Sequence, residues 1–259
     1  MAFILLSLSL HSRKTNNMDD FQLISKYAIC YGIYFLILFV GKTEHSNRLF
    51  DDGGPVYNSG ILLGIQLAGI LWLGVVPFLI LKHSISDIVF GQETPTILQV
   101  CCLLLLLFTS VITAITETTK INAGKTVQQQ QVFLFDKKFI RQYILYRTIF
   151  LISYEVFFRG YLLTDMIHRA GLFTAIVINT ALYALLHSFS DKKEIIACIP
   201  FGILLCFTCL WFGAAWPAIV IHTVFAIIYE LKLLKKNSCT INKMRYENIC
   251  HRLFRLYRE

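Results

Sequence analysis

The chain has 259 residues, of which 56% are hydrophobic and only 15% are charged, and its mean hydropathy is +0.62. Soluble domains average about 25% charged residues, so this composition and its long apolar runs exclude a soluble globule. The formal net charge of +8 does not indicate nucleic-acid binding, because the basic residues gather in loops and in the last 28 positions without a known nucleic-acid motif. The composition therefore predicts an integral, multi-pass membrane protein with no nucleic-acid partner.

The first twenty residues contain a short apolar stretch, at positions 2–10, that cannot span a bilayer. No basic region precedes this stretch and no small-residue cleavage site follows it, so a signal peptide is not predicted. We expect residues 1–20 to be a leader outside the fold, either disordered or, if translation starts at Met18, not translated.

Seven later segments each hold close to the twenty apolar residues that a membrane span needs. They cover residues 21–41, 61–81, 97–115, 143–163, 172–189, 195–212 and 214–231. The predicted fold class is all-α, a polytopic transmembrane helical bundle of about seven spans. The expected regions are a leader (1–20), N-terminal spans with a polar linker (21–142), a core (143–231) and a basic tail (232–259).

Basic residues set the expected orientation. The loops after the third and fifth spans and the C-terminal tail carry most of the lysines and arginines, and all three lie on one side if there are seven spans. By the positive-inside rule, this side is cytoplasmic and includes the C-terminus. The tail from residue 241 interleaves basic and apolar residues, which suits either an amphipathic helix on anionic lipid or a solvated tail.

The fourth predicted span contains a polar break in which Glu155 and Arg159 are four residues apart, so they share one face of a helix. An ionisable residue inside a bilayer costs about 2.5–3.5 kcal/mol on insertion scales, and such residues usually pair and mark function. Two interpretations follow: an ion pair that only locks one helix to its neighbours, or part of a functional site.

Two histidines and an asparagine occur in the following apolar spans. His187 ends the fifth, His222 lies near the middle of the seventh, and Asn179 lies about two turns before His187. Polar groups in lipid turn inward to satisfy one another, so we expect Glu155, His187 and His222 to converge in the bundle.

A carboxylate and two imidazoles could perform two kinds of chemistry. They could activate water and stabilise an oxyanion, or they could ligate zinc with an open position for water. Zinc is not favoured, because the sequence has no H-E-x-x-H motif, and no cofactor is predicted. The C-x-x-C pair at Cys206 and Cys209 lies in an apolar segment and is interpreted as small buried side chains.

Three short motifs in order along the chain resemble those of the CPBP family, the CAAX proteases and bacteriocin-processing enzymes that include the type II CAAX prenyl endopeptidases. Family members have E-E-x-x-x-R, then an aromatic residue and three residues before a histidine, then H-x-x-x-N on a later span. The corresponding segments here are residues 154–160, 183–187 and 222–226, and Trp216-Pro217 shortly before the last histidine also fits. The resemblance covers residues 143–231.

The resemblance implies an intramembrane endopeptidase of the glutamic type that cleaves a membrane-associated peptide or a lipidated protein tail. In this interpretation His187 and Glu155 activate water, His222 stabilises the oxyanion and Arg159 holds Glu155 in place. Tyr154, Tyr183 and Asn179 are supporting residues. It also implies a multi-pass protein of a bacterial inner (plasma) membrane.

Two positions depart from the family pattern. The first glutamate, which the family uses as general base, is Tyr154 here, and a phenol is a poor base at neutral pH. The asparagine that helps to hold the oxyanion is Ala226, which has no donor on its side chain. The alternative prediction is therefore a catalytically impaired membrane scaffold, regulator or bacteriocin-immunity protein on the same fold.

Overall fold

The structure is a computed structural model that describes residues 17–43, 50–51, 54–55, 58–81, 83–120, 137–189 and 192–235. The predictions for the first sixteen residues of the leader, for residues 121–136 of the linker and for the tail beyond residue 235 lie outside these ranges.

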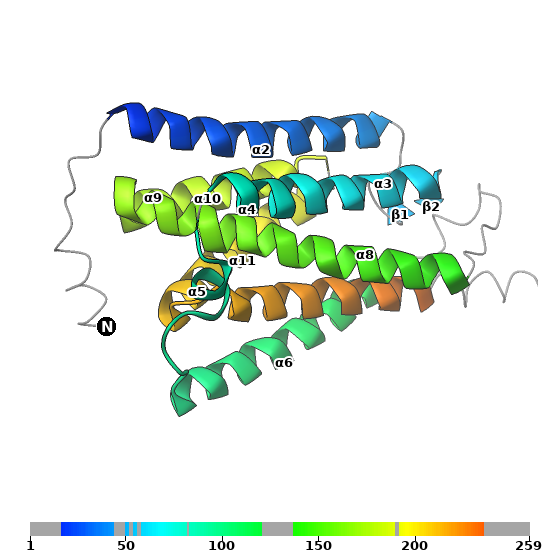
Figure 1. The fold of residues 1–259 in the computed structure, drawn as a ribbon. Coiled ribbons are helices and arrows are strands. Elements are labelled where there is room, and N and C mark those ends of the chain that lie inside the picture. Colours follow the sequence, from blue (N-terminus) through cyan, green and yellow to red (C-terminus); the bar gives the residue numbers. More distant parts are fainter. Residues whose placement is uncertain are drawn as a thin grey trace, which may run out of the picture.

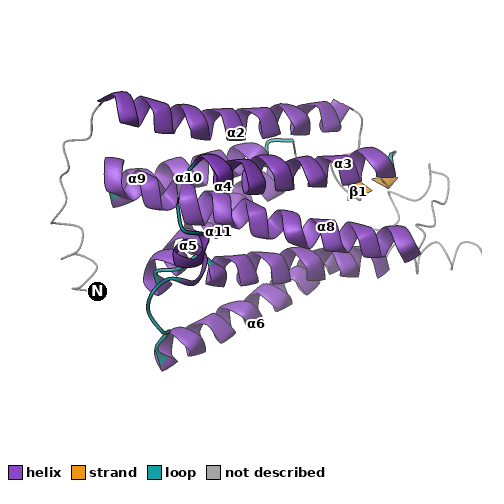
Figure 2. Ribbon diagram, in the orientation of Figure 1, coloured by secondary structure: helices purple, strands orange, loops and turns teal. Residues whose placement is uncertain are grey.

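Helices make up nearly all of this part of the chain (Figure 2). In order they are α2 (Asn17–Thr43), α3 (Ser59–Ile70), η1 (Leu71–Val75), α4 (Val76–Ile80), α5 (Ile85–Phe90), α6 (Ile97–Lys120), α8 (Lys137–Glu155), η2 (Val156–Leu162), α9 (Leu163–Ala170), α10 (Leu172–Leu186), α11 (Lys192–Phe212) and a last helix, Trp216–Lys235. The antiparallel pair β1 (Phe50–Asp51) and β2 (Gly54–Pro55) forms a small turn between α2 and α3.

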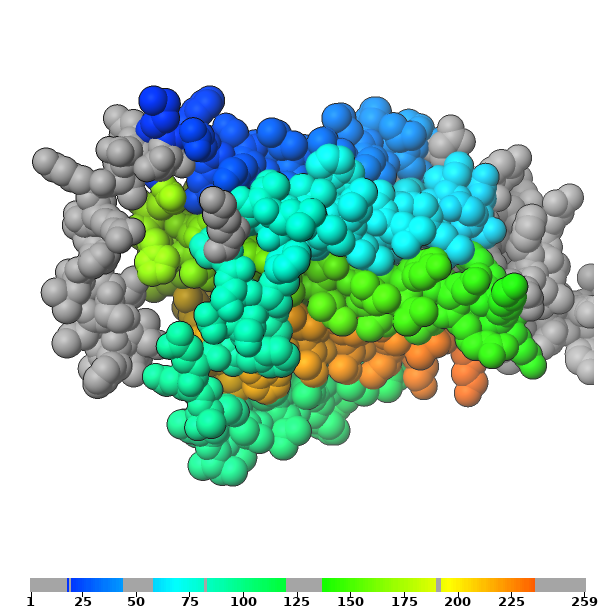
Figure 3. All heavy atoms as spheres, in the orientation of Figure 1, coloured from blue at the N-terminus to red at the C-terminus, as the bar shows by residue number. Residues whose placement is uncertain are grey.

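The long helices lie side by side with roughly similar axis directions, with α2 along one edge of the view and α6 along the other (Figure 1). The space-filling view shows close packing of side chains across this face, from α2 through α3 and α8 (Figure 3). This arrangement confirms the predicted all-α, polytopic bundle.

Five helices are long and apolar enough to cross a membrane, and they correspond to the predicted spans one, two, three, six and seven. The fourth predicted span lies in a continuous helical run, α8–η2–α9, that carries three charged residues between positions 147 and 159. The fifth, α10, is shorter than predicted because its helix ends at Leu186 rather than continuing to residue 189. The chain is thus an integral, multi-pass membrane protein.

Apolar side chains are exposed along the outer faces of the bundle, especially on α2 and α6, including Phe21, Leu36, Leu104 and Phe108. In a bilayer these faces contact acyl chains, where exposed leucine and phenylalanine carry no penalty. The buried core instead centres on η2, in which all seven residues are buried. The buried core is therefore centred on the helical segment that carries the polar break.

Two segments have the wider i→i+5 hydrogen-bond pattern of a π-helix. In η1 the bond runs from Val76 N to Leu71 O, just before Pro77, whose ring nitrogen can donate no hydrogen bond. In η2 it runs from Leu163 N to Phe158 O. Such bulges are rare and occur often at functional sites, and η2 follows Glu155 directly.

Short connections fix the helices around η2. The turn after α11 has Gly213 at φ 63°, a left-handed conformation that glycine adopts without steric cost. From the same turn Ala215 N donates to Ile88 O at 3.0 Å, and Ile88 on α5 packs directly over Gly160 of η2. The short helix α5 is therefore wedged between η2 and the start of the last helix.

Candidate active site

Glu155 is the last residue of α8 and Arg159 lies one turn later, in η2. Both side chains have no exposed surface, and Arg159 Nε lies 3.3 Å from Glu155 Oε2 while Arg159 Nη1 donates to Oε1 at 3.4 Å. The Nε–Oε2 contact is an ion pair without good hydrogen-bond alignment, since both atoms lack a hydrogen-bond partner. A buried carboxylate needs such a cation, because an isolated charge is very costly to bury.

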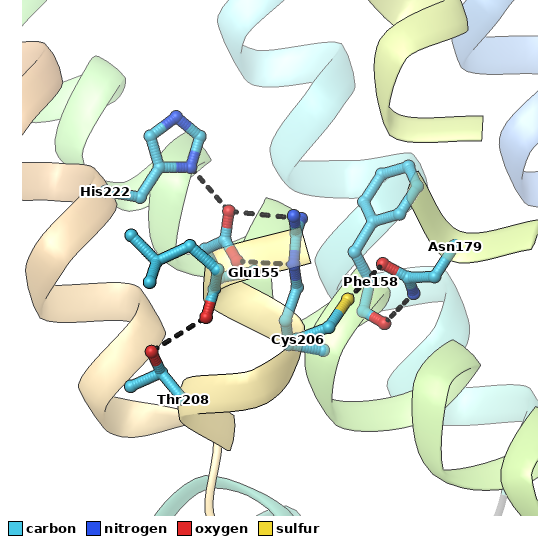
Figure 4. Close-up of polar contacts among 8 residues, drawn as sticks. Glu155, Phe158, Asn179, Cys206, Thr208 and His222 are labelled. Carbon is cyan, nitrogen blue, oxygen red and sulfur yellow. Dashed lines mark hydrogen bonds and ion pairs between the residues drawn. The ribbon is translucent and has the colours of Figure 1, made fainter. Parts of the chain in front are cut away.

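His222 comes from the last helix and contacts the same carboxylate. Its Nδ1 lies 2.5 Å from Glu155 Oε1, and its side chain is 9% exposed. Figure 4 shows the imidazole of His222 directed at the carboxylate of Glu155. The guanidinium of Arg159 contacts the same carboxylate. The structure thus brings together two residues that are 67 positions apart in the sequence.

Aromatic rings surround this group. The rings of Tyr154 and Tyr183 lie 6.0 Å and 6.1 Å from the His222 ring, and Phe201 packs edge-on at 5.5 Å. The guanidinium of Arg159 stands 4.5 Å from the centroid of the Tyr183 ring, a cation–π contact. These rings surround the carboxylate with apolar surface, which strengthens its attraction to the Arg159 guanidinium.

Asn179 on α10 is fully buried and holds η2 in place. Its Nδ2 donates to Phe158 O at 2.5 Å, and its Oδ1 accepts from Cys206 Sγ at 3.4 Å, as Figure 4 shows. Phe158 O is also the acceptor of the π-helical bond from Leu163. The predicted supporting residue therefore braces the backbone on which Arg159 is carried.

His187 caps the C-terminal end of α10 and is half-buried. Its Nδ1 lies 3.0 Å from Tyr183 O, its Nε2 lies 4.0 Å from Glu194 Oε1, and its ring is 4.8 Å from the Tyr183 ring. Tyr183 therefore contacts both histidines, with His222 in direct contact with Glu155 and His187 nearer the end of its helix.

The two departures from the family motifs both lie in the interior. Tyr154 is 3% exposed, and within the described residues its hydroxyl is buried without a hydrogen-bond partner. Ala226 is buried one turn after His222. Among the described ranges, no group of three or more histidine, cysteine, aspartate or glutamate side chains is arranged to hold a metal ion.

Two site residues were missed by sequence reasoning. Cys206 was interpreted only as a small apolar side chain, and Glu194 was not considered. Cys206 lies six residues before the end of an apolar helix, so composition gives no sign of its contact with Asn179. Glu194 in the first turn of α11 follows a loop, and only the fold places it near His187.

A second carboxylate–histidine pair lies outside this site. Asp165 on α9 accepts a hydrogen bond from Tyr27 Oη at 2.8 Å and lies 3.2 Å from His83 Nε2. One turn later, Arg169 forms an ion pair with Asp20 on the same two helices. These contacts join α2 to α9 and were not predicted.

Fold and site together define a multi-pass helical membrane protein with a buried carboxylate–imidazole–guanidinium cluster. Residues 137–228 match the model of a family described as type II CAAX prenyl endopeptidase Rce1-like. This match confirms, for that segment, the resemblance to the CPBP family, a family of membrane proteases. No curated protein and no solved structure gives a significant match to the chain.

Proposed function

We propose that the protein is an intramembrane endopeptidase that hydrolyses a peptide bond in a membrane-associated or lipidated peptide. The observation that carries this proposal is the contact between Glu155 and His222 inside the segment that matches the protease family. A buried imidazole held by a carboxylate is the arrangement that prepares a histidine to take a proton from a nucleophile.

The contact supports a different division of roles from the one inferred from the sequence. Because an ionised carboxylate only accepts hydrogen bonds, Nδ1 of His222 carries the proton and Nε2 remains a free base. His222 then takes a proton from water as the water oxygen attacks the peptide carbonyl. Glu155 is a positioning residue that fixes the tautomer and stabilises the imidazolium, and Arg159 holds Glu155.

His187 completes the proposed set as general acid. Its Nδ1 is directed at Tyr183 O, so Nδ1 donates and Nε2 exchanges a proton with the site. Nε2 lies 4.0 Å from Glu194 Oε1. As the C–N bond of the tetrahedral intermediate breaks, the leaving amine takes the proton from His187.

The test uses the full chain in liposomes with two quenched fluorescent peptides, one with a C-terminal prenylcysteine and one apolar and unlipidated. His222→Ala and His187→Ala are each expected to lower the cleavage rate about 10²–10⁴-fold, the usual contribution of general acid–base catalysis. His168→Ala, an exposed histidine on α9, is the matched control and should cleave as the natural protein does. Equal cleavage by all four proteins would refute the assignment.

A non-catalytic membrane scaffold, regulator or immunity protein is the second candidate. One observation favours it: Tyr154 and Ala226 stand where the family motifs have the general base and an oxyanion donor, and both side chains are buried in the site. The double variant Tyr154→Glu, Ala226→Asn discriminates between the two candidates. Hydrolysis by the double variant but not by the natural protein would establish the second candidate.

We further propose that the protein resides in a bacterial plasma membrane with its C-terminus in the cytoplasm. The basic residues at the start of α11 and at the end of the last helix support this orientation, and contacts with anionic lipid would favour it. A C-terminal reporter active only in the cytoplasm tests it, and an inactive reporter in intact protein would reverse the orientation.

A further inference from the structure

The hydroxyl of Tyr154 is a buried donor without an acceptor. The side chain is 3% exposed, and among the described residues Tyr154 Oη has no hydrogen-bond partner. Burying a hydroxyl without a partner costs free energy that phenylalanine at the same position would avoid. An unpartnered polar group of this kind in a packed interior requires an explanation, and an absent ligand is one.

The position of the Tyr154 ring indicates where such a ligand would bind. Tyr154 precedes Glu155, and its ring lies 6.0 Å from the His222 ring at an interplanar angle of 78°. It also packs 5.8 Å from Tyr183 and 4.7 Å from Phe158. Tyr154 therefore forms part of the wall around the imidazole that would activate water.

The proposed reaction needs a donor at this place. When water attacks the peptide carbonyl, the C=O π electrons move to oxygen, and the resulting oxyanion needs hydrogen-bond donors. With His222 as base, that histidine no longer fills this role, and Ala226 offers only a methyl group. Arg159 directs Nε and Nη1 at Glu155, and its guanidinium lies over the Tyr183 ring; Nη2 has no hydrogen-bond partner among the described residues, but its charge is paired with Glu155.

We propose that Tyr154 Oη donates a hydrogen bond to the carbonyl oxygen of the scissile peptide bond and holds it as the oxyanion forms. The inference rests on the proposed hydrolysis. No proton is transferred: the phenol keeps its hydrogen and the hydrogen bond shortens as charge develops on the oxygen. Tyr154 is then a catalytic residue that compensates for the missing donor at position 226.

Tyr154→Phe tests this directly, because it removes the hydroxyl and keeps the ring. It should lower kcat for the quenched peptides about 10²–10³-fold, the usual cost of one oxyanion donor, and leave KM unchanged. Tyr161→Phe is the matched control: its hydroxyl is also buried without a partner, but its ring packs against His83. This variant should retain the full rate.

A binding measurement separates the inference from the proposed function. A phosphinate peptide, which mimics the tetrahedral intermediate but cannot be cleaved, is titrated into each protein in detergent micelles and followed by fluorescence anisotropy. Tyr154→Phe should weaken its binding about 10²-fold, while Tyr161→Phe binds as the natural protein does. This result would support the role of Tyr154 even if the natural protein cleaved neither peptide.

Three outcomes would overturn the inference: equal phosphinate binding by the natural protein and Tyr154→Phe, equal losses in both phenylalanine variants, or no phosphinate binding by the natural protein. The free energy of unfolding of Tyr154→Phe is measured as a control for loss of structure. Deleting an unpartnered hydroxyl should leave this free energy unchanged or raise it. A Tyr154→Phe protein that is less stable than the natural protein would show that the hydroxyl has a structural partner instead.

Discussion

Two carboxylate–histidine pairs among the described residues, Glu155–His222 and Asp165–His83, lie in contrasting surroundings. The Glu155 and His222 side chains are 0% and 9% exposed, whereas those of Asp165 and His83 are 10% and 37% exposed. Glu155 has a permanent cation beside it in Arg159, while the second partner of Asp165 among the described residues is the neutral hydroxyl of Tyr27. Both carboxylates contact a histidine, but the fully buried one is also paired with an arginine. The difference indicates that burial of the carboxylate, rather than its contact with a histidine, calls for a permanent cation.

The largest expected effect on stability is at the buried pair, Glu155 and His222. Arg159→Met removes the cation but leaves Glu155 buried, so the free energy of unfolding should fall by about 3–5 kcal/mol. Reversible unfolding in mixed dodecyl maltoside–SDS micelles, followed by circular dichroism, measures this loss. The double variant Glu155→Gln, Arg159→Met removes both charges and should be more stable than Arg159→Met alone. If it is less stable, the buried charge is not the cause of the loss.

An intermediate effect on stability is expected at the more exposed pair, Asp165 and His83. Tyr27→Phe deletes the donor to Asp165, and a hydrogen bond to a charged group contributes about 1.5–3 kcal/mol. The matched variant is Tyr31→Phe, one turn later on α2, which loses a bond to the backbone carbonyl of Leu182. That neutral bond contributes about 0.5–1.5 kcal/mol, so Tyr31→Phe should be the more stable of the two by the same unfolding measurement. The reverse order would contradict this ranking of the two hydrogen bonds.

The smallest effect is expected for His83. His83→Ala removes a partly exposed partner of Asp165, and exposed ion pairs contribute about 0–1 kcal/mol. The loss should also shrink at high salt, because salt screens exposed charges. If His83→Ala lowered the free energy of unfolding as much as Arg159→Met does, the proposed difference between the two pairs would be wrong.

Part of the site was predictable from local spacing and part from burial. The i,i+4 spacing of Glu155 and Arg159 gave their ion pair directly, since neighbours on one helix face need no tertiary information. The convergence of His222 with Glu155 followed from the rule that polar groups in lipid turn inward. The seven-span prediction held in part for the same reason, because length and hydropathy are local properties.

Other features depend on information that no local pattern holds. The π-helical hydrogen bonding of η2 begins directly after Glu155, whereas the sequence argument assumed a regular α-helix. The Tyr27–Asp165 hydrogen bond joins residues 138 positions apart, and no local pattern in either segment predicts this pairing. The contacts of His187 with Tyr183 and Glu194 depend on where α10 ends, and helix ends are the least predictable boundaries.

The shortness of α10 has a consequence for the lipids around it. Its fifteen residues rise about 22 Å, while the hydrocarbon core of a bilayer is about 30 Å thick. A bilayer adapts to such hydrophobic mismatch by thinning locally and by drawing headgroups and their hydration inward. A dip of the aqueous boundary at the end of α10 that carries His187 would let a water molecule reach a site otherwise enclosed by hydrocarbon.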